Sequence, residues 1–282
     1  PRSVTEFQIA ALLHIEANSP AIMVPRVVRT VDGDTSIRIA DDDDTRYTAR
    51  VLSWIPGIPL SDVEPDEAIA VRLGAALAEL DNALEDFEHP ASDYPLIWDM
   101  KRAQNLEQLL ETVDDLALRD TLQQHLDNFK KRVEPRFPEL RWQVIYNDLN
   151  ASNVLVDGAE NDQIAGIIDF GDMIRSPLVI DVAVGAAYLV RDGDEPLAPV
   201  FDFVRGFDSI TALTPQEFDL LPQLIAMRNV LTIVISSWRA AWQPGNREYL
   251  LRSQAKARRL LTMLGQNQSA EISRDLRRHC GA

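Results

Sequence analysis

The stretch VIYNDLNASNVLVDGAENDQIAGIIDFGD, residues 144–172, decides how this chain is expected to fold. It contains three short β-rich runs, Val144–Tyr146, Val154–Val156 and Ile164–Ile168. Polar loops separate the runs, which is the pattern of short strands joined by turns. We therefore expect a small β-structure here whose loops present polar side chains at the strand ends.

Each of these runs has an acid or amide beside it that can face a cation. Asp148 follows the first run, Asn153 precedes the second and Asp169 closes the third. Mg²⁺ prefers hard oxygen ligands, usually one or two carboxylates together with waters and phosphate oxygens. This is the arrangement of a phosphotransferase, in which one carboxylate accepts a proton while an amide oxygen and a second carboxylate hold Mg²⁺. The alternative is that these are ordinary turn residues, with Gly171 as a turn former.

The stretch resembles the aminoglycoside phosphotransferase and choline kinase superfamily of small-molecule kinases. Within it, the resemblance is to the hydroxylysine kinase branch, whose members continue as I-D-F-G-D-M-x-x-S/T-P-L-x-x-D, here residues 168–181. The resemblance runs from the first helix to the C-terminus and implies an α+β, protein-kinase-like fold with ATP and Mg²⁺ as cofactors. It also implies that Asp148 is the catalytic base and that Asn153 and Asp169 are the metal ligands.

One departure from the family pattern precedes the catalytic aspartate. Many relatives have His-Gly there, whereas this chain has Tyr146 and Asn147. A tyrosine can still pack and donate one hydrogen bond. We therefore expect activity to be retained.

The first 56 residues are expected to form a partial N-terminal lobe, a helix plus a small antiparallel sheet, and residues 57–282 a large helical lobe carrying the catalytic and metal-binding loops. In the first lobe we predict a helix over Val4–Glu16 and strands over Val27–Val28, Ile37–Ile39 and Tyr47–Trp54. Asp32-Gly33 is a hairpin signal between the first two strands. The acidic run Asp41–Asp44 is predicted to be a solvated loop tip, because consecutive carboxylates cannot converge on one metal ion.

The resemblance also implies where the nucleotide binds. Glu6 is the best-placed residue to pair with a phosphate-binding lysine, although a carboxylate early in a helix is also favoured by the helix dipole. Leu52 and Trp54 fall where the backbone of the hinge would meet adenine, and Trp54 could equally be a core aromatic at the lobe junction. None of the four lysines lies in the first hundred residues, and the first glycine is Gly33. Because the chain also lacks an initiator Met, we expect that the natural protein begins earlier.

The rest of the chain reads as helices. They are predicted over 66–88, 98–112, 114–133, 177–191, 196–209, 215–241, 247–264 and 268–279. Asp181 lies in an apolar helical segment and must find hydrogen-bond donors, for which the backbone amides of the catalytic loop are the best candidates. Asp172 follows Asp-Phe-Gly and is a candidate to attract a substrate ammonium, with a scaffold role as the alternative.

Composition limits the choice of partners. Among the 282 residues, 28 Lys and Arg against 44 Asp and Glu give a net charge of −16, which disfavours nucleic acid and anionic membranes and favours a cationic, amine-bearing metabolite. Acidity that only serves solubility is the alternative. The single cysteine, Cys280, excludes a disulfide within the chain and favours the cytoplasm. No apolar run is expected to be long enough to span a membrane, and the oligomeric state is left open.

These observations predict an ATP-dependent kinase that acts on a hydroxyl of a small amine-containing molecule, with hydroxylysine as the acceptor that the resemblance suggests. Aminoglycosides, choline and homoserine remain alternatives. A non-catalytic, nucleotide- or ligand-binding module is the second hypothesis, because the phosphate-binding lysine and glycine-rich loop are missing. An aminoglycoside-type phosphotransferase within a longer, multidomain chain is the third.

Overall fold

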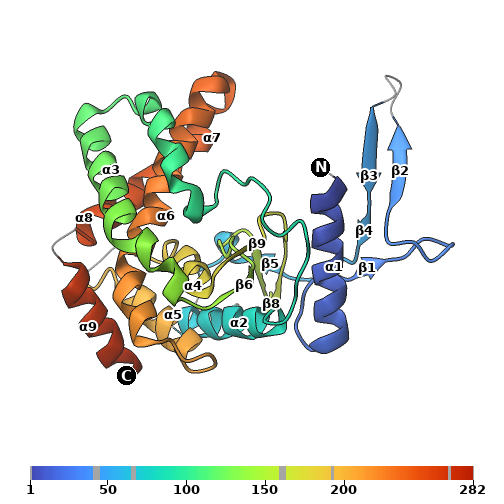
Figure 1. Cartoon of the computed structure of the whole chain (residues 1–282). Coiled ribbons are helices and arrows are strands. Elements are labelled where there is room, and N and C mark those ends of the chain that lie inside the picture. Colours follow the sequence, from blue (N-terminus) through green and yellow to red (C-terminus); the bar gives the residue numbers. More distant parts are fainter. Residues whose placement is uncertain are drawn as a thin grey trace.

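The computed structural model describes residues 2–40, 45–64, 68–158, 163–191, 194–265 and 268–281. Figure 1 shows one helix and four short strands set to one side of a larger, mostly helical body. The predicted mixed α+β class is confirmed. The lobe boundary that we place at residue 56 remains a prediction.

The smaller part begins with a helix that packs on the rest of the molecule. Its elements are α1 (Arg2–Asn18), β1 (Val27–Val28), β2 (Ile37–Ala40), β3 (Arg46–Ala49) and β4 (Val51–Leu52). One face of α1 is buried, and Phe7 on that face stacks on Phe87 with ring centroids 6.0 Å apart. The β2–β3 hairpin projects away from the helical body, and every residue of β2 is exposed.

The strand pairing differs from the prediction. β1 pairs with β4, and β2 pairs with β3, so Asp32-Gly33 does not join two paired strands. A turn is present there, with Gly33 in the left-handed region at φ 89°, but the chain leaves it for a different partner strand. The prediction for Asp41–Asp44 falls on residues outside the described part of the chain.

The predicted strand Tyr47–Trp54 is also divided. It splits at Arg50 into β3 and β4 and ends at Leu52. The break follows from the Arg50 side chain, whose guanidinium turns to α1 and donates to the side chain of Gln8 and the carbonyl of Thr5.

The larger part holds two small antiparallel sheets under a set of helices. The strands are β5 (Ile58–Pro59), β6 (Trp142–Ile145), β7 (Val154–Val156), β8 (Ile164–Ile167) and β9 (Ile174–Pro177). β5, β7 and β8 form one sheet in that order, and β6 pairs with β9. The three predicted strands of residues 144–168 therefore exist within a residue or two of their expected bounds.

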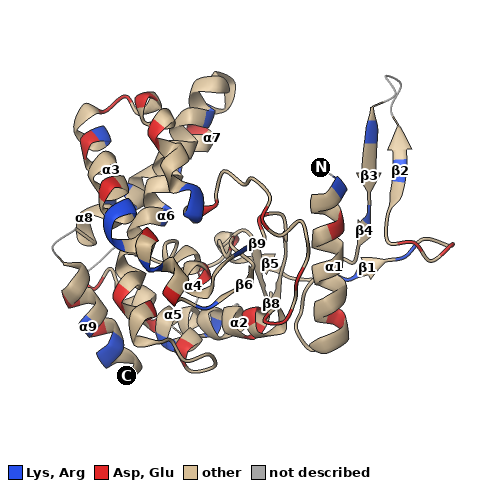
Figure 2. Cartoon of the chain, viewed as in Figure 1, with Lys and Arg blue, Asp and Glu red and all other residues tan. Residues whose placement is uncertain are grey.

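The helices of this part surround one long central helix. They are α2 (Ile69–Ala83), α3 (Leu116–Asn128), α4 (Leu178–Ala186), α5 (Ala198–Asp208), α6 (Pro215–Trp242), α7 (Arg247–Leu251), α8 (Gln254–Met263) and α9 (Ser269–Cys280). α2 and α5 approach closely at glycines: a Cβ on Gly74 would lie 1.9 Å from the carbonyl oxygen of Phe203. Figure 2 shows acidic residues on elements of both parts of the molecule.

Several predicted helices are shorter or wound differently. The segment predicted as a helix at 98–112 is a 3-10 helix, Met100–Thr112. The segment predicted at 114–133 is α3 followed by a π-helical turn, Phe129–Val133. The helix predicted to run to 191 ends at Ala186, and the one predicted at 247–264 is two helices, α7 and α8. Periodicity places apolar faces but does not fix where a helix frays or changes its winding.

α6 corrects the expectation about membrane spans. By length and composition its 28 residues could cross a membrane, yet 83% of its most apolar 18-residue window is buried inside the fold. Its N-terminus carries a capping box between Thr214 and Glu217. Buried Glu217 also accepts from Arg141, the residue before β6, with Nη2 and Oε2 2.5 Å apart. α6 is thus a core helix fixed beside the strand that leads into the catalytic loop.

Candidate active site

The loop after β6 is held by one buried carboxylate. Asp181 on α4 accepts from the backbone N–H of Tyr146 through Oδ2 at 2.6 Å and from that of Asn147 through Oδ1 at 2.8 Å. This confirms the prediction that Asp181 finds its donors in the catalytic loop. Asn147 is in the left-handed region at φ 66°, a conformation that costs energy for a residue other than glycine. The loop therefore keeps its shape because Asp181 fixes it.

Asp148 and Asn153 are joined side chain to side chain. The Asn153 amide nitrogen donates to Asp148 Oδ2 at 2.7 Å and to the Asp148 carbonyl at 3.1 Å. Because the nitrogen is used in this way, the carbonyl oxygen of the Asn153 amide is left to face another group, as a metal ligand must. Burial raises the pKa of Asp148, and the positive charge of Arg228 opposes that rise.

Asp169 lies beside Asn153 because β7 and β8 are in register. Val154 pairs with Ile167, and the N–H of Ile168 donates to the Asn153 carbonyl at 2.9 Å. Asp169 itself is left-handed, with φ 59°, and its Oδ1 accepts the N–H of Gly171 at 3.1 Å. The two proposed metal ligands therefore sit at neighbouring strand ends.

The donor set fits Mg²⁺ shared with a nucleotide. Over the described ranges, no group of three or more His, Cys, Asp or Glu residues is placed to hold a metal ion. One amide oxygen and one carboxylate leave most positions of an octahedral ion to water and phosphate oxygens, which is how Mg²⁺ is commonly bound. Asn153 and Asp169 would then be the protein's contribution.

Asp172 follows Gly171 in the chain and is electrostatically coupled to Asp148 and Asp169. Its pKa is raised to about 6, first by burial and then by the negative charges of Asp148 and Asp169, while Arg228 and Arg239 oppose the rise. Its backbone carbonyl accepts from the Asn147 side chain at 3.1 Å. Asp172 is thus within electrostatic reach of Asp148, and its contact with a substrate ammonium remains a prediction.

The residues predicted to contact the nucleotide do not form a cluster like that of Asp148, Asn153 and Asp169. Glu6 is not brought to the other site residues: its partly exposed carboxylate pairs with Arg2 at 2.5 Å. Leu52 is half-buried and pairs with Val27 across β1 and β4. Trp54 is 87% exposed, so the alternative reading of it as a core aromatic is wrong. Nucleotide contacts of Glu6, Leu52 and Trp54 remain predictions.

The structure adds residues to the site that the sequence did not single out. Gln8, rather than Glu6, links α1 to the metal-side loop, donating to the Gly171 carbonyl at 3.2 Å and accepting from Arg50 at 2.6 Å. Tyr94 donates to the same carbonyl at 2.9 Å. Arg228 lies beside Asp148, with 3.5 Å between Nη2 and Oδ1. Of these, only Arg228 carries a sequence signal, because it is a cation in the middle of the apolar run LIAMRNVLTIV.

The tyrosine that replaces the usual histidine keeps a structural role. Tyr146 is buried, packs edge-on against Phe170 with centroids 5.1 Å apart, and its hydroxyl donates to the carbonyl of Ile168. This confirms the prediction that Tyr146 packs and donates one hydrogen bond. The hydroxyl ties the catalytic loop to the residue before Asp169.

A second buried acid lies behind the loop and predicts a pH dependence of stability. The pKa of Asp81 on α2 is raised well above its usual value, first by burial and then by the charge of neighbouring Asp181. Because this pKa is higher in the fold than in the unfolded chain, the fold binds more protons, and the free energy of unfolding falls as pH rises from the unfolded pKa toward the raised one. Asp81→Asn removes the titration. We therefore expect the melting temperature of the variant to fall less than that of the wild type between about pH 5 and 8.

Differential scanning fluorimetry over that pH range checks this expectation. Asp120→Asn, on the exposed surface of α3, is the matched control because it makes the same chemical change without burial. Melting curves that shift in parallel for the wild type and Asp81→Asn would contradict the assignment.

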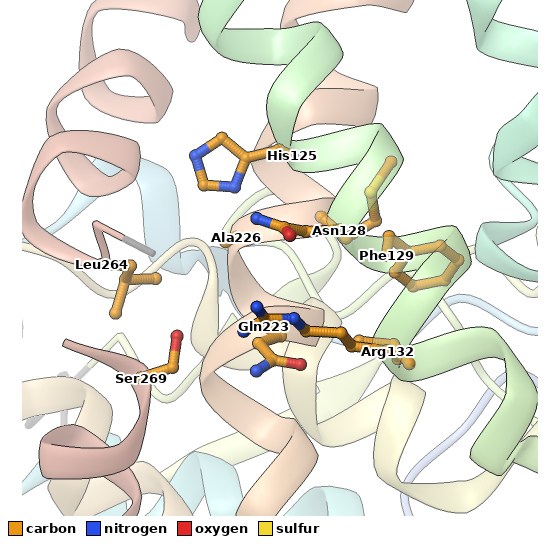
Figure 3. Close-up of a pocket in the computed structure, with 10 residues that line it drawn as sticks. His125, Asn128, Phe129, Arg132, Gln223, Ala226, Leu264 and Ser269 are labelled. Atoms are coloured by element: carbon orange, nitrogen blue, oxygen red, sulfur yellow. The ribbon is translucent and has the colours of Figure 1, made fainter. Parts of the chain in front are cut away.

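A separate pocket lies in the helical body. Figure 3 shows it between α3 with the turn that follows it, α6, the end of α8 and the start of α9; its lining residues include His125, Asn128, Arg132, Gln223 and Ser269. None of its lining residues belongs to the loops described above. Burial lowers the pKa of His125, which favours its neutral form.

The geometry defines a class of protein. A partly buried aspartate, an asparagine bonded to it and a second aspartate at the adjacent strand end match the arrangement that a kinase-like phosphotransferase needs. The chain matches the model of the phosphotransferase enzyme family over residues 2–213. It belongs to that family.

Curated relatives narrow the comparison. The chain is 29% identical over 233 residues to the hydroxylysine kinase of Mus musculus, covering 78% of this chain and 62% of that protein. It is 28% identical over 238 residues to the hydroxylysine kinase of Bos taurus, covering 80% and 63%. The chain thus spans a little under two thirds of the length of these relatives.

Solved structures show the same fold. A microcompartment-associated aminopropanol kinase superposes with a TM-score of 0.75 at 18% identity, covering 96% of this chain and 83% of that one. An amicoumacin kinase, solved with AMP-PNP and Ca²⁺, superposes with a TM-score of 0.64 at 14% identity, covering 90% and 78%. These matches confirm the predicted protein-kinase-like fold. The family model and the curated relatives confirm the predicted superfamily.

Proposed function

We propose that this chain transfers the γ-phosphoryl group of ATP to a hydroxyl of a small amine-bearing alcohol, with hydroxylysine as the first acceptor to test. The observation that carries the proposal is the hydrogen bond from the Asn153 amide nitrogen to Asp148, which leaves the amide oxygen available as a metal ligand at the strand end next to Asp169. The named curated relatives support the choice of acceptor.

In this proposal Asp148 is the general base. It accepts the proton of the acceptor hydroxyl as the hydroxyl oxygen bonds to the γ-phosphorus and the bond to the β–γ bridging oxygen breaks, which releases ADP. Burial raises the pKa of Asp148, which makes its carboxylate a stronger proton acceptor than an exposed aspartate. Asn153 and Asp169 would hold Mg²⁺, which supplies positive charge to the phosphates when it is bound.

The acidic character of the site supports an amine on the acceptor. Asp172 adds a carboxylate beside the catalytic aspartate, in a chain whose net charge is −16. Opposite charges raise the encounter rate and the local concentration of a cationic substrate, and salt screens the effect.

A panel assay tests the proposal. MgATP consumption would be measured with hydroxylysine, an aminoglycoside, choline, homoserine and a neutral hexose, with a chelator as the metal control. We expect amine-bearing alcohols to be preferred to the hexose, hydroxylysine to rank first, and kcat/KM for the best amine to fall as ionic strength rises. A preference for the hexose would refute the charge argument and leave the kinase assignment standing.

A binding module remains the second candidate, because none of the four lysines precedes Lys101. The same assay separates the two functions. A binding module would be stabilised by MgATP in thermal melts, since a ligand of the folded state raises the melting temperature. It would consume no MgATP with any acceptor.

A further inference from the structure

Arg228 is the least satisfied charged side chain of the site. It is 2% exposed, and Nη2 donates to the Tyr188 hydroxyl at 2.8 Å. Its ion pair with Asp148 is 3.5 Å long, which exceeds the length of a charge-assisted hydrogen bond. Nε and Nη1 are buried and have no hydrogen-bond partner among the residues that the structure describes. A buried guanidinium with unused donors is costly, unless a bound anion completes it.

A second arginine shares an aromatic partner with Arg228. The guanidinium carbon of Arg228 lies 4.7 Å from the ring centroid of Trp98, and that of Arg239 lies 5.6 Å from the same centroid. Both arginines project from α6, eleven residues apart and therefore on one face of the helix. Arg239 is exposed and Arg228 is buried, so the cluster of Arg228, Trp98 and Arg239 runs from the interior to the surface.

The two arginines share the site with acids. Arg228 lies 3.5 Å from Asp148, and the charges of both arginines oppose the rise in the pKa of Asp172, so positive and negative groups lie near one another here. An acceptor that carries only an amine could pair with Asp172 but would leave the buried Nε and Nη1 donors of Arg228 without a partner. An acceptor with an ammonium and a carboxylate would pair its ammonium with Asp172 and its carboxylate with the arginines. A guanidinium matches the planar oxygens of a carboxylate better than an ammonium does.

We propose that Arg228, Arg239 and Trp98 form a subsite for the carboxylate of the acceptor, so that the acceptor class is hydroxy-amino acids and not amino alcohols that lack a carboxylate. The inference rests on the proposed function for its acceptor hydroxyl. Arg228 also pairs with the proposed base Asp148, so the test rests on Arg239 and on binding measured without nucleotide.

Matched acceptors test the subsite directly. 5-Hydroxylysine would be compared with 1,5-diaminopentan-2-ol, and homoserine with 3-aminopropan-1-ol, since the members of each pair differ only by the carboxylate. Dissociation constants would be measured by calorimetry with no nucleotide present, and KM and kcat in the MgATP assay. We expect the preferred amino acid to bind at least about tenfold more tightly than its decarboxylated partner, the usual worth of one charge-assisted contact.

Variants locate the effect. Arg239→Gln changes an exposed residue and so should keep the fold. It should raise Kd and KM for the amino acid but not for its decarboxylated partner, which reduces the preference for the amino acid. Arg247→Gln, on exposed α7, is the control and should change neither. Arg228→Lys should weaken the binding of the amino acid further than Arg239→Gln does. Circular dichroism would verify that this variant is folded.

The outcomes separate this subsite from the proposed function. Equal binding of both members of each pair to the wild type would overturn the subsite, and so would an Arg239→Gln effect no larger than that of Arg247→Gln. A retained preference in binding with no MgATP consumption for any acceptor would refute the kinase proposal and support the subsite.

Discussion

Asp148→Asn is expected to lower kcat by about 100-fold or more, the usual contribution of a general base. Asparagine keeps the size of the side chain and an oxygen for the Asn153 amide, but it cannot take up the hydroxyl proton. The Asn153–Asp169 pair is not altered by the change, so nucleotide affinity should stay within a few-fold of the wild type.

Steady-state kinetics with the best acceptor and calorimetric titration of MgATP measure the two quantities separately. Asp120→Asn makes the same chemical change on an exposed helix and is expected to leave both unchanged. Near-normal turnover of Asp148→Asn would show that another group takes the proton.

Asp181→Asn is expected to cost about 2 to 3 kcal/mol of unfolding free energy. Both carboxylate oxygens of Asp181 accept backbone N–H groups, those of Tyr146 and Asn147. Asparagine has one side-chain oxygen, so its NH₂ would face one of these donors and leave that donor unpaired in the interior. The strained backbone of Asn147 would lose its support, and kcat should fall as well.

Urea unfolding followed by circular dichroism measures the stability change, and the kinetic assay measures the second effect. The exposed Asp120→Asn variant again serves as the control. An unchanged unfolding free energy would mean that the loop holds its conformation without Asp181.

The part of the site that lies close together in the sequence could be predicted from it. Asp148, Asn153 and Asp169 fall within 22 residues and sit at strand ends whose pairing is local, so their spacing alone indicates that they meet. The contact of Asp181 with this loop was predictable for a different reason. A lone acid in an apolar helix needs hydrogen-bond donors, and the backbone N–H groups of the loop after β6 are unpaired by any strand.

Contacts between distant segments could not be predicted in this way. Gln8 meets Arg50 across 42 positions and Gly171 across 163, and no local pattern marks those pairs. The Asp32-Gly33 prediction failed for a related reason, because a turn dipeptide specifies a reversal of the chain but not which strand pairs with which. The type of helix over residues 98–112 could not be predicted either. Arg102, inside the predicted helix, has non-helical φ −106° and ψ 23°, and its side chain bonds to Asp99 and Asp93.

The Gln8 amide makes the first lobe and the metal-side loop thermodynamically linked. Its oxygen is committed to Arg50 and its nitrogen to the carbonyl of Gly171, so the amide has one orientation that satisfies both neighbours. A ligand whose phosphates drew Arg50 away would free that oxygen and relax the constraint on Gly171. Linkage is reciprocal, so an ion that fixed the Asp169 loop would change the affinity of the protein for such a ligand by the same factor. Nucleotide and metal would then act on each other's occupancy through a single side chain.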